Sequence, residues 1–143
     1  MNQTNDGGYS YTVSRVVDAP VRTVWQAWTR PEQYEQWFGA VPGSVELDVR
    51  RGGTWRATMP GDETMTGSYG DVVEEERLVS LTDWPDRDPS VMDIRFAEAE
   101  GGTRIEISQT CGTAEERDGA RTGAETLMGW CADYLAGGAP PAT

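Results

Sequence analysis

The sequence predicts an α+β protein in which a curved antiparallel sheet of about seven strands wraps around one long C-terminal helix. Residues 44–111 hold six strand-like runs, separated by short turn signals such as GG, GDE and EGG. These connections leave no room for crossover helices, so neighbouring strands should be antiparallel. After residue 112 the apolar residues recur every three and four positions, which indicates a helix long enough to cover the sheet.

The N-terminal part of the chain is expected to supply one strand and two short helices. Residues 9–17 alternate and are rich in β-branched side chains, as is typical of a strand. Pro20 suits the first position of a helix. Four apolar side chains share one face of that helix: Val21, Val24, Trp25 and Trp28. Thr29 and Glu32 resemble a capping box, which predicts a second short helix ending at Gly39.

The sheet is completed by the six later runs. They are SVELDVR at 44–50, TWRATMP at 54–60, TMTGSYGDVVEE at 64–75, RLVSLTDW at 77–84, SVMDIRFAEA at 90–99 and TRIEISQTC at 103–111. Thr113 and Glu116 form a second capping box at the start of the long helix. Its apolar positions are Ala120, Ala124, Leu127, Met128, Cys131, Tyr134 and Leu135. A sheet that grips a helix in this way is a helix-grip arrangement, and a cavity between the two is the natural place for a ligand.

With 143 residues the chain is expected to form one domain over residues 9–136, between flexible termini at 1–8 and 137–143. Its net charge of -12 disfavours nucleic acid and anionic membranes as partners. All 12 cationic residues are Arg and no His is present, which excludes lysine Schiff bases, imidazole-dependent triads and nearly all usual zinc sites. We therefore expect no metal and no cofactor.

Cys111 and Cys131 are too few for a disulfide framework, and the first ten residues lack the basic and apolar regions of a signal peptide. We expect both thiols to be small apolar side chains in the interior of a cytoplasmic protein. No apolar run approaches the roughly 20 residues that span a bilayer, so no membrane insertion is expected.

Several segments together resemble one family. APVRTVWQAWTRPEQYEQWFG at 19–39 is similar to its signature of an Ala-Pro opening, a Val-Trp-x-Ala-Trp-Thr helix and a Trp-Trp-Gly close. ELDVRRGGTWRATM at 46–59 resembles its Asp-x-Arg-x-Gly-Gly-x-Trp hairpin, and ERLVSLTDW, GGTRIEI and DYL follow in the expected order. This is the START-like, or SRPBCC, superfamily, in the branch named for homology to the activator of the heat-shock chaperone ATPase. The resemblance covers residues 9–136 and implies the helix-grip fold.

The resemblance leaves the function open, because the superfamily includes carriers of hydrophobic ligands, polyketide cyclases and aromatases, hydroxylase domains and a co-chaperone. Three positions depart from its pattern. The aromatic close is Trp37 and Phe38 before Gly39; Ala124 stands where the last helix usually has Trp; and Trp130 stands where the family is usually polar. Losing the indole at Ala124 would leave a void unless another group fills it.

Strand alternation and the apolar character of the inner face identify candidate cavity-lining residues. The methionines among them are flexible and suit an apolar ligand of uncertain shape, and Gln109 could orient a ligand carbonyl or hydroxyl or bond to the backbone instead. We expect Trp37 to pack beneath the open edge of the sheet and Phe38 to border the cavity mouth. The expected lining is Phe38, Trp55, Met59, Met65, Tyr69, Trp84, Met92, Phe96, Gln109, Ala124 and Met128.

The favoured function is binding of a small hydrophobic molecule without catalysis, by a monomer or a homodimer. One alternative is an enzyme of the polyketide cyclase or aromatase kind, whose proton carrier would have to be Tyr69, Tyr134 or a carboxylate such as Asp83. A further alternative is a co-chaperone or regulatory interaction module, which an exposed apolar patch around Trp130 would favour. No residue stands out as catalytic.

Overall fold

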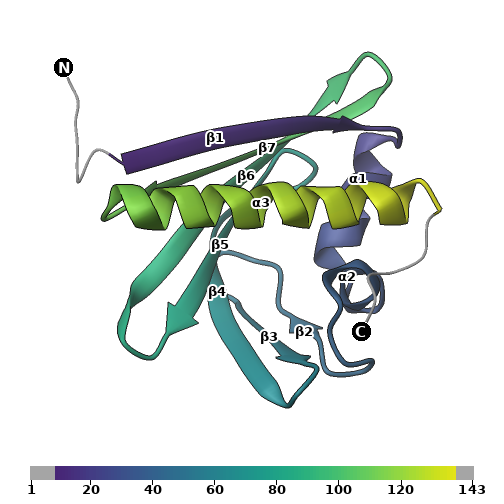
Figure 1. Cartoon of the computed structure of the whole chain (residues 1–143). Helices are drawn as coiled ribbons and strands as arrows, with labels where there is room; N and C mark the ends of the chain where they lie inside the picture. The colour runs from purple at the N-terminus through teal and green to yellow at the C-terminus, as the bar shows by residue number, and fades with distance from the viewer. Residues whose placement is uncertain (1–8, 138–143) are drawn as a thin grey trace.

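The computed structural model describes residues 9–137, and its elements follow the predicted order (Figure 1). The strands and helices are β1 (Tyr9–Val17), α1 (Val21–Thr29), α2 (Pro31–Phe38), β2 (Glu46–Leu47), β3 (Thr54–Met59), β4 (Glu63–Val73), β5 (Arg77–Trp84), β6 (Arg87–Ala99), β7 (Gly102–Cys111) and α3 (Ala114–Leu135). The expected flexible segments at 1–8 and 138–143 lie outside the described residues. Gly137 is described, and its N–H donates to the carbonyl of Tyr134 at the end of α3.

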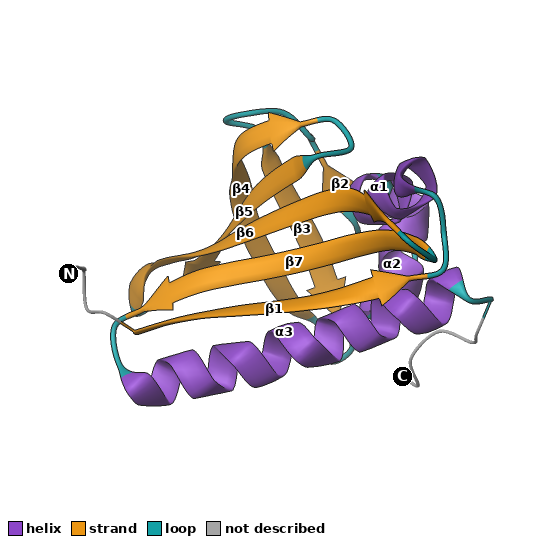
Figure 2. Cartoon of the chain, turned by 90° about the horizontal axis from the view of Figure 1, so that it is seen from above, coloured by secondary structure: helices purple, strands orange, loops and turns teal. Residues whose placement is uncertain are grey.

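All seven strands form one antiparallel sheet in the order β1-β7-β6-β5-β4-β3-β2. The first strand in the sequence, β1, pairs with the last, β7, from Tyr9 opposite Cys111 to Val17 opposite Thr103. The other neighbouring strands of the sheet follow one another in the sequence. The sheet stays open, with β1 and β2 at its edges, and it curves so that α3 runs along its concave side (Figure 2). The predicted helix-grip fold is therefore confirmed.

A bulge in β4 helps to bend the sheet. Tyr69 lies opposite Ser80 and Val72 lies opposite Leu78, so β4 contains one residue more than β5 between these two pairs. Such an extra residue bends the strand and increases its twist. In Figure 1, β3 and β4 extend away from α3.

The long helix packs against β1 and β7, and its C-terminal end reaches α1 and α2. The Arg117 guanidinium lies 6.0 Å from the ring of Tyr9, and Gly129 lies beside Arg15, so β1 and α3 run in the same direction. The buried Tyr11 therefore lies level with the first half of α3, where Ala124 is 1% exposed.

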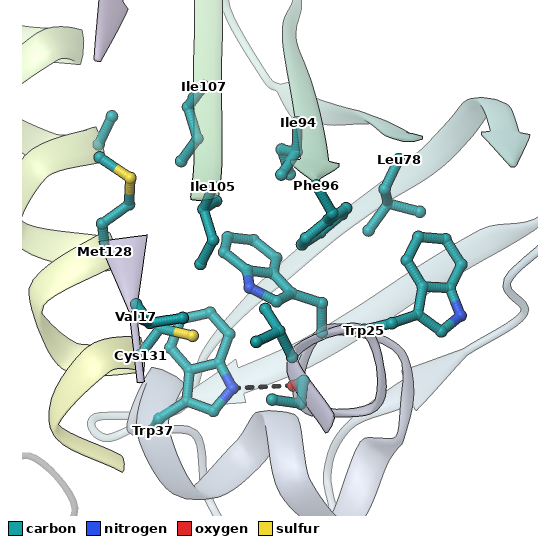
Figure 3. Close-up of a cluster of buried hydrophobic side chains, with 14 of the residues drawn as sticks. Val17, Trp25, Trp37, Leu78, Ile94, Phe96, Ile105, Ile107, Met128 and Cys131 are labelled. Atoms are coloured by element: carbon teal, nitrogen blue, oxygen red, sulfur yellow. Dashed lines mark hydrogen bonds between the residues drawn. The ribbon is translucent and has the colours of Figure 1, made fainter. Parts of the chain in front are cut away.

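The core joins the concave face of the sheet to all three helices (Figure 3). Trp37 has no exposed surface, and its Nε1 donates a hydrogen bond to the carbonyl of Ala27 over 2.8 Å. Ile105 and Ile107 of β7 face it from the sheet side and are also fully buried. Trp37 is therefore part of the buried core, and its hydrogen bond links α2 to α1.

Two strands differ in length from the sequence-based expectation. The run at 44–50 forms a strand only at Glu46–Leu47, because the chain then turns through Asp48 and Arg50 toward β3. β6 begins at Arg87 instead of residue 90, so Pro89 lies inside a strand. Trp84 pairs with Arg87 while Thr82 pairs with Ser90, and the bulge between them explains how β6 tolerates a proline.

The helix starts also differ in part. Thr29 does not cap α2, because its hydroxyl donates to the carbonyl of Trp25 within α1, and Arg30 is the residue before α2. At α3 the predicted cap is present: the N–H of Glu116 donates to Thr113 Oγ1 over 3.0 Å. The Glu116 carboxylate accepts from the N–H of Gly112 rather than from Thr113 itself.

The two cysteines are free thiols with different surroundings. Cys131 on α3 is fully buried, as predicted, and burial raises the pKa of its thiol to about 12. Cys111 at the end of β7 is only partly buried, so the prediction of an interior thiol is too strong there. Within residues 9–137, no helix has the length and hydropathy needed to cross a membrane.

Candidate functional site

A cavity of about 80 Å³ lies between the concave face of the sheet and the three helices. Its walls come from all three helices and from strands β2 to β6, which the fold brings together from widely separated parts of the chain. The lining residues are Trp28, Tyr34, Phe38, Leu47, Trp55, Met65, Tyr69, Leu78, Ser80, Thr82, Met92, Ile94 and Leu127. All lie within the described part of the chain, and none of them carries a charge.

The floor of the cavity is built from rows of residues that lie side by side on neighbouring strands. One row contains Tyr69 of β4, Ser80 of β5 and Met92 of β6. The next contains Gly67 of β4 and Thr82 of β5. Because side chains alternate along a strand, Ser80 and Thr82 face the same side as the buried Leu78.

The opposite wall is aromatic. Tyr34 and Phe38 of α2 are stacked, with ring centroids 4.7 Å apart and an angle of 21° between the planes. The ring of Trp37 meets that of Tyr34 edge-on at 5.0 Å, so the buried Trp37 supports the wall from behind. α3 adds Leu127 to the lining.

Trp55 is held in place by a close contact with a glycine. Its Nε1 donates to the carbonyl of Leu81 over 3.0 Å, which lays the indole across β4 at Gly67. A Cβ atom on Gly67 would lie 2.3 Å from Trp55 Nε1 and 1.9 Å from the Leu81 oxygen. The absence of a side chain at Gly67 is therefore what allows Trp55 to line the cavity.

Two phenol groups supply the most distinctive polar character of the cavity. Burial raises the pKa of Tyr69, and the nearby Asp48 carboxylate adds to the effect. Burial also raises the pKa of Tyr34, with a further contribution from Tyr69. Both phenols therefore stay protonated at neutral pH, where they can donate hydrogen bonds but cannot act as bases.

Five of the predicted lining residues border this cavity: Phe38, Trp55, Met65, Tyr69 and Met92. They come from α2, β3, β4 and β6. The alternation of strand residues and the WFG ending of α2 were sufficient to find them. Phe38 is partly buried at the cavity while Trp37 is fully buried, which agrees with the roles expected of the two rings.

The other six predicted residues lie elsewhere, and three of them belong to the closed core. Phe96 is buried against the edge of the Trp25 ring, with centroids 5.5 Å apart. Ala124 and Met128 on α3 are 1% and 2% exposed and belong to the main hydrophobic core. These side chains are buried where the helices pack on the sheet, so they offer no free surface to a ligand.

The remaining three lie at the margins of the sheet. Trp84 is at the β5–β6 turn, 36% exposed, where its Nε1 donates to Ser90 and Arg87 lies over its ring. Met59 packs on a small separate cluster with Ala40, Val45 and Ala57. Gln109 lies opposite Tyr11, whose hydroxyl donates to its side-chain oxygen, so Gln109 neither bonds to the backbone nor lines the cavity.

Sequence reasoning missed several lining residues. Ser80 and Thr82 could have been found, because they follow Leu78 at alternate positions and place hydroxyl groups on a face that is otherwise apolar. Trp28 was recognised as an inward-facing helix residue but was not assigned to a cavity. Tyr34 depends on how α2 is rotated against the sheet, which no local pattern encodes.

A second and more open hollow, of about 560 Å³, lies over the outer face of the sheet. It is bordered by Arg77, Arg95 and Arg104 together with acidic residues. Arg95 and Arg104 are exposed. Arg77 and Arg95 both pair with Asp93, over 3.0 Å and 3.5 Å, so much of the positive charge there is already balanced. Among residues 9–137, no three His, Cys, Asp or Glu side chains are grouped so that they could hold a metal ion.

Comparison with solved structures finds the same fold in many bacterial proteins. DynU16, a putative protein in the dynemicin biosynthetic locus, aligns with a TM-score of 0.79 and 21% identity over 92% of this chain and 49% of that protein. A protein from Staphylococcus saprophyticus gives 0.76 and 19%, covering 94% of this chain and 97% of that chain. A protein from Mycobacterium smegmatis gives 0.69 and 26%, covering 94% and 96%.

Comparison with curated proteins gave no match. The sequence profile described as "Activator of Hsp90 ATPase homolog 1-like protein" matches residues 18–136, from the loop before α1 to the end of α3. That span contains both short helices, strands β2 to β7 and the whole lining of the cavity. The chain belongs to this family, in the SRPBCC superfamily of helix-grip proteins.

Proposed function

We propose that this protein binds a small hydrophobic molecule in the cavity between the sheet and the helices, without transforming it. The observation that carries the proposal is the composition of the cavity wall, which combines aromatic and methionine side chains with a few hydroxyl groups and no charge. Small-molecule sites typically have this make-up, in which an apolar surface provides affinity and a few polar groups fix the orientation.

The size of the cavity limits what it takes up in this conformation. A volume of about 80 Å³ is smaller than the roughly 150 Å³ of an apolar cavity that takes up benzene. Met65 and Met92 are unbranched and partly buried, so a change of their rotamers enlarges the space at little cost. We therefore propose ligands of one or two rings, admitted by movement of the methionines and of Leu127.

The cavity does not favour the cyclase alternative. The lining, all of it within residues 9–137, contains no carboxylate that could serve as a general base. Tyr69, one of the three candidates for a proton carrier, is held protonated by burial. Asp83 accepts a hydrogen bond from Thr66 on an exposed part of the sheet, and Tyr134 donates weakly to Gln33 over 3.4 Å. Asp83 and Tyr134 are not among the lining residues, and Tyr69 lines the cavity but stays protonated at neutral pH, so none of the three can act as a base toward a bound molecule.

The interaction-module alternative rests on one exposed aromatic side chain. Trp130 on α3 is 38% exposed, and single apolar side chains on a surface are common in proteins.

We add the cytoplasm as the proposed compartment, because Cys111 and Cys131 are free thiols.

Native mass spectrometry of freshly purified protein, followed by titration with toluene, tests the binding proposal. In the titration the methyl signals of Met65 and Met92 are followed by NMR. We expect these signals to shift in a saturable way in the wild type. Ser80→Leu, which fills the cavity from its floor, should abolish the shifts, whereas Ser14→Leu on an exposed position of β1 should not. Equal shifts in the wild type and Ser80→Leu, or none in the folded wild type, would overturn the proposal.

A further inference from the structure

Three hydroxyl groups of the cavity lie together on its floor, and a fourth comes from the facing helix α2. Tyr69 and Ser80 are direct partners across β4 and β5, and Thr82 follows Ser80 on the same face of β5. Tyr34 of α2 lines the same cavity as Tyr69. The fold therefore brings two O–H donors together from opposite walls of one cavity.

Neither phenol donates a hydrogen bond to a group in the described part of the chain. Among residues 9–137, several other buried or half-buried polar side chains have partners: Tyr11 donates to Gln109, Trp37 to Ala27 and Trp55 to Leu81. The indole Nε1 of Trp28, which also lines the cavity, is a further buried donor without a partner in this part of the chain. Within the same part of the chain, no group accepts a hydrogen bond from the hydroxyl of Tyr34 or Tyr69. Polar groups in protein interiors are nearly always paired, so unpaired donors among the lining residues of one cavity indicate a place for an acceptor.

The charge around the cavity decides what kind of acceptor fits. The lining residues include no Arg, and the Asp48 carboxylate is close enough to raise the pKa of Tyr69. A carboxylate on the ligand would therefore lose its hydration without gaining a cationic partner among the lining residues. An uncharged carbonyl oxygen accepts from both phenols without this cost.

The remaining walls favour a flat ring beside that oxygen. Tyr34 and Phe38 present stacked rings, and Trp55 lies across Gly67 on the floor. Aromatic faces and methionine sulfur both make favourable contacts with an aromatic guest.

We propose that Tyr34 and Tyr69 together bind the carbonyl oxygen of an uncharged aromatic ketone or aldehyde, whose ring lies against Phe38, Trp55 and Met92. This rests on the proposed binding function and adds the class of ligand and the two residues that select it. It makes the phenols specificity-determining donors, and it requires no bond to be made or broken.

The test uses two ligands of nearly the same shape. Acetophenone has a carbonyl oxygen where α-methylstyrene has a methylene group, and benzoate offers an anion of similar size. Dissociation constants are measured for the full chain by NMR titration of the methionine methyl groups. The variants are Tyr34→Phe and Tyr69→Phe, with Tyr134→Phe as a matched control, because Tyr134 does not line the cavity and bonds to Gln33.

We expect Tyr34→Phe and Tyr69→Phe each to weaken acetophenone binding by roughly threefold to tenfold, as the loss of one hydrogen bond predicts. Neither variant should weaken binding of α-methylstyrene, and Tyr134→Phe should change neither ligand. Benzoate should bind more weakly than acetophenone.

The outcomes separate this inference from the binding function on which it rests. If both neutral ligands bind but the two phenylalanine variants lower their affinities equally or not at all, the phenols do not read the carbonyl and the inference is wrong, while the binding function stands. If benzoate binds best, the ligand class is wrong. If neither neutral ligand shifts the methionine signals of the folded wild type, both proposals fail together.

Discussion

The indole of Trp55 lies directly against Gly67, its partner across β3 and β4, and this contact sets the shape of the cavity floor. Any Cβ atom at Gly67 would overlap both the indole and the carbonyl of Leu81 to which the indole donates. The indole of Trp55 thus packs directly on the backbone of β4 at Gly67.

Replacing this glycine should therefore damage fold and site together. We expect Gly67→Ala to lower the free energy of unfolding by at least about 2 kcal/mol, because the overlap forces Trp55 off its rotamer. Chemical denaturation measures the loss, and toluene titration should show that binding is reduced as well. A variant as stable as the wild type would mean that Trp55 has another position available.

The helical glycines should behave in the opposite way. A Cβ at Gly119 or Gly123 would meet nothing within 4 Å, so these glycines do not serve a close approach of α3 to the sheet. We expect Gly119→Ala and Gly123→Ala each to stabilise the protein by about 0.5–1 kcal/mol in urea unfolding, because alanine is the better helix former. Gly102→Ala is the contrasting control: its φ is 140° and its Cβ would lie 2.0 Å from the Val17 oxygen, so it should destabilise.

Alanine substitutions at the neighbouring residues Trp37 and Phe38 should have different effects, the first mainly on stability and the second mainly on ligand binding. Trp37→Ala removes a fully buried indole and its hydrogen bond to Ala27, and it should cost about 3–5 kcal/mol. Phe38→Ala removes a half-buried ring at the cavity and should cost about 1–2 kcal/mol while weakening toluene binding several-fold. Equal losses of stability with unchanged binding would show that Phe38 is part of the core and not of the site.

Thr103 joins the start of β7 to the loop before α1. Its side chain is fully buried, and Oγ1 donates to the carbonyl of Ala19 over 2.7 Å. We expect Thr103→Val to cost about 1–3 kcal/mol by leaving that buried carbonyl unpaired. Thr12→Val, which loses an exposed contact with Ser108, should change the unfolding free energy far less. Similar costs for the two variants would argue against a special role for this link.

The ion pair on the outer face of the sheet should make stability depend on acid pH. The pKa of Asp93 is lowered chiefly by hydrogen bonds from Arg77, with the charges of Arg77 and Arg95 adding to the effect. A carboxyl with a lowered folded-state pKa stabilises above its unfolded pKa of about 3.9, and that stabilisation is lost as the pH falls through the folded value.

Asp93→Asn should therefore be less stable than the wild type at pH 7, and the difference should begin to shrink below about pH 4. Thermal unfolding of both proteins from pH 2.5 to pH 7 measures it. Added salt at pH 7 should also narrow the difference, because Arg77 and Asp93 are partly exposed. A difference that is constant across this pH range would mean that Asp93 acts through packing and not through its charge.

The sequence by itself determined the order of the elements, the antiparallel sheet and the long covering helix. The reasons are local: apolar residues alternate at 9–17 and 103–111, turn signals are too short for crossovers, and Thr113 caps α3. Periodicity also predicted which face of each strand points inward, and this was enough to select Trp55, Tyr69 and Met92 as cavity residues.

Only the tertiary structure decided which inward-facing residues meet empty space and which meet one another. Phe96 and Ala124 point inward like Met92, yet they are closed off by α1 and by the packing of α3 on the sheet. Tyr34 and Tyr69 are 35 residues apart in the sequence, and they line one cavity because the fold brings α2 and β4 to its facing walls. A cavity is what remains after all elements have packed, so its position is a property of the assembled fold and cannot be read from the period of any single segment.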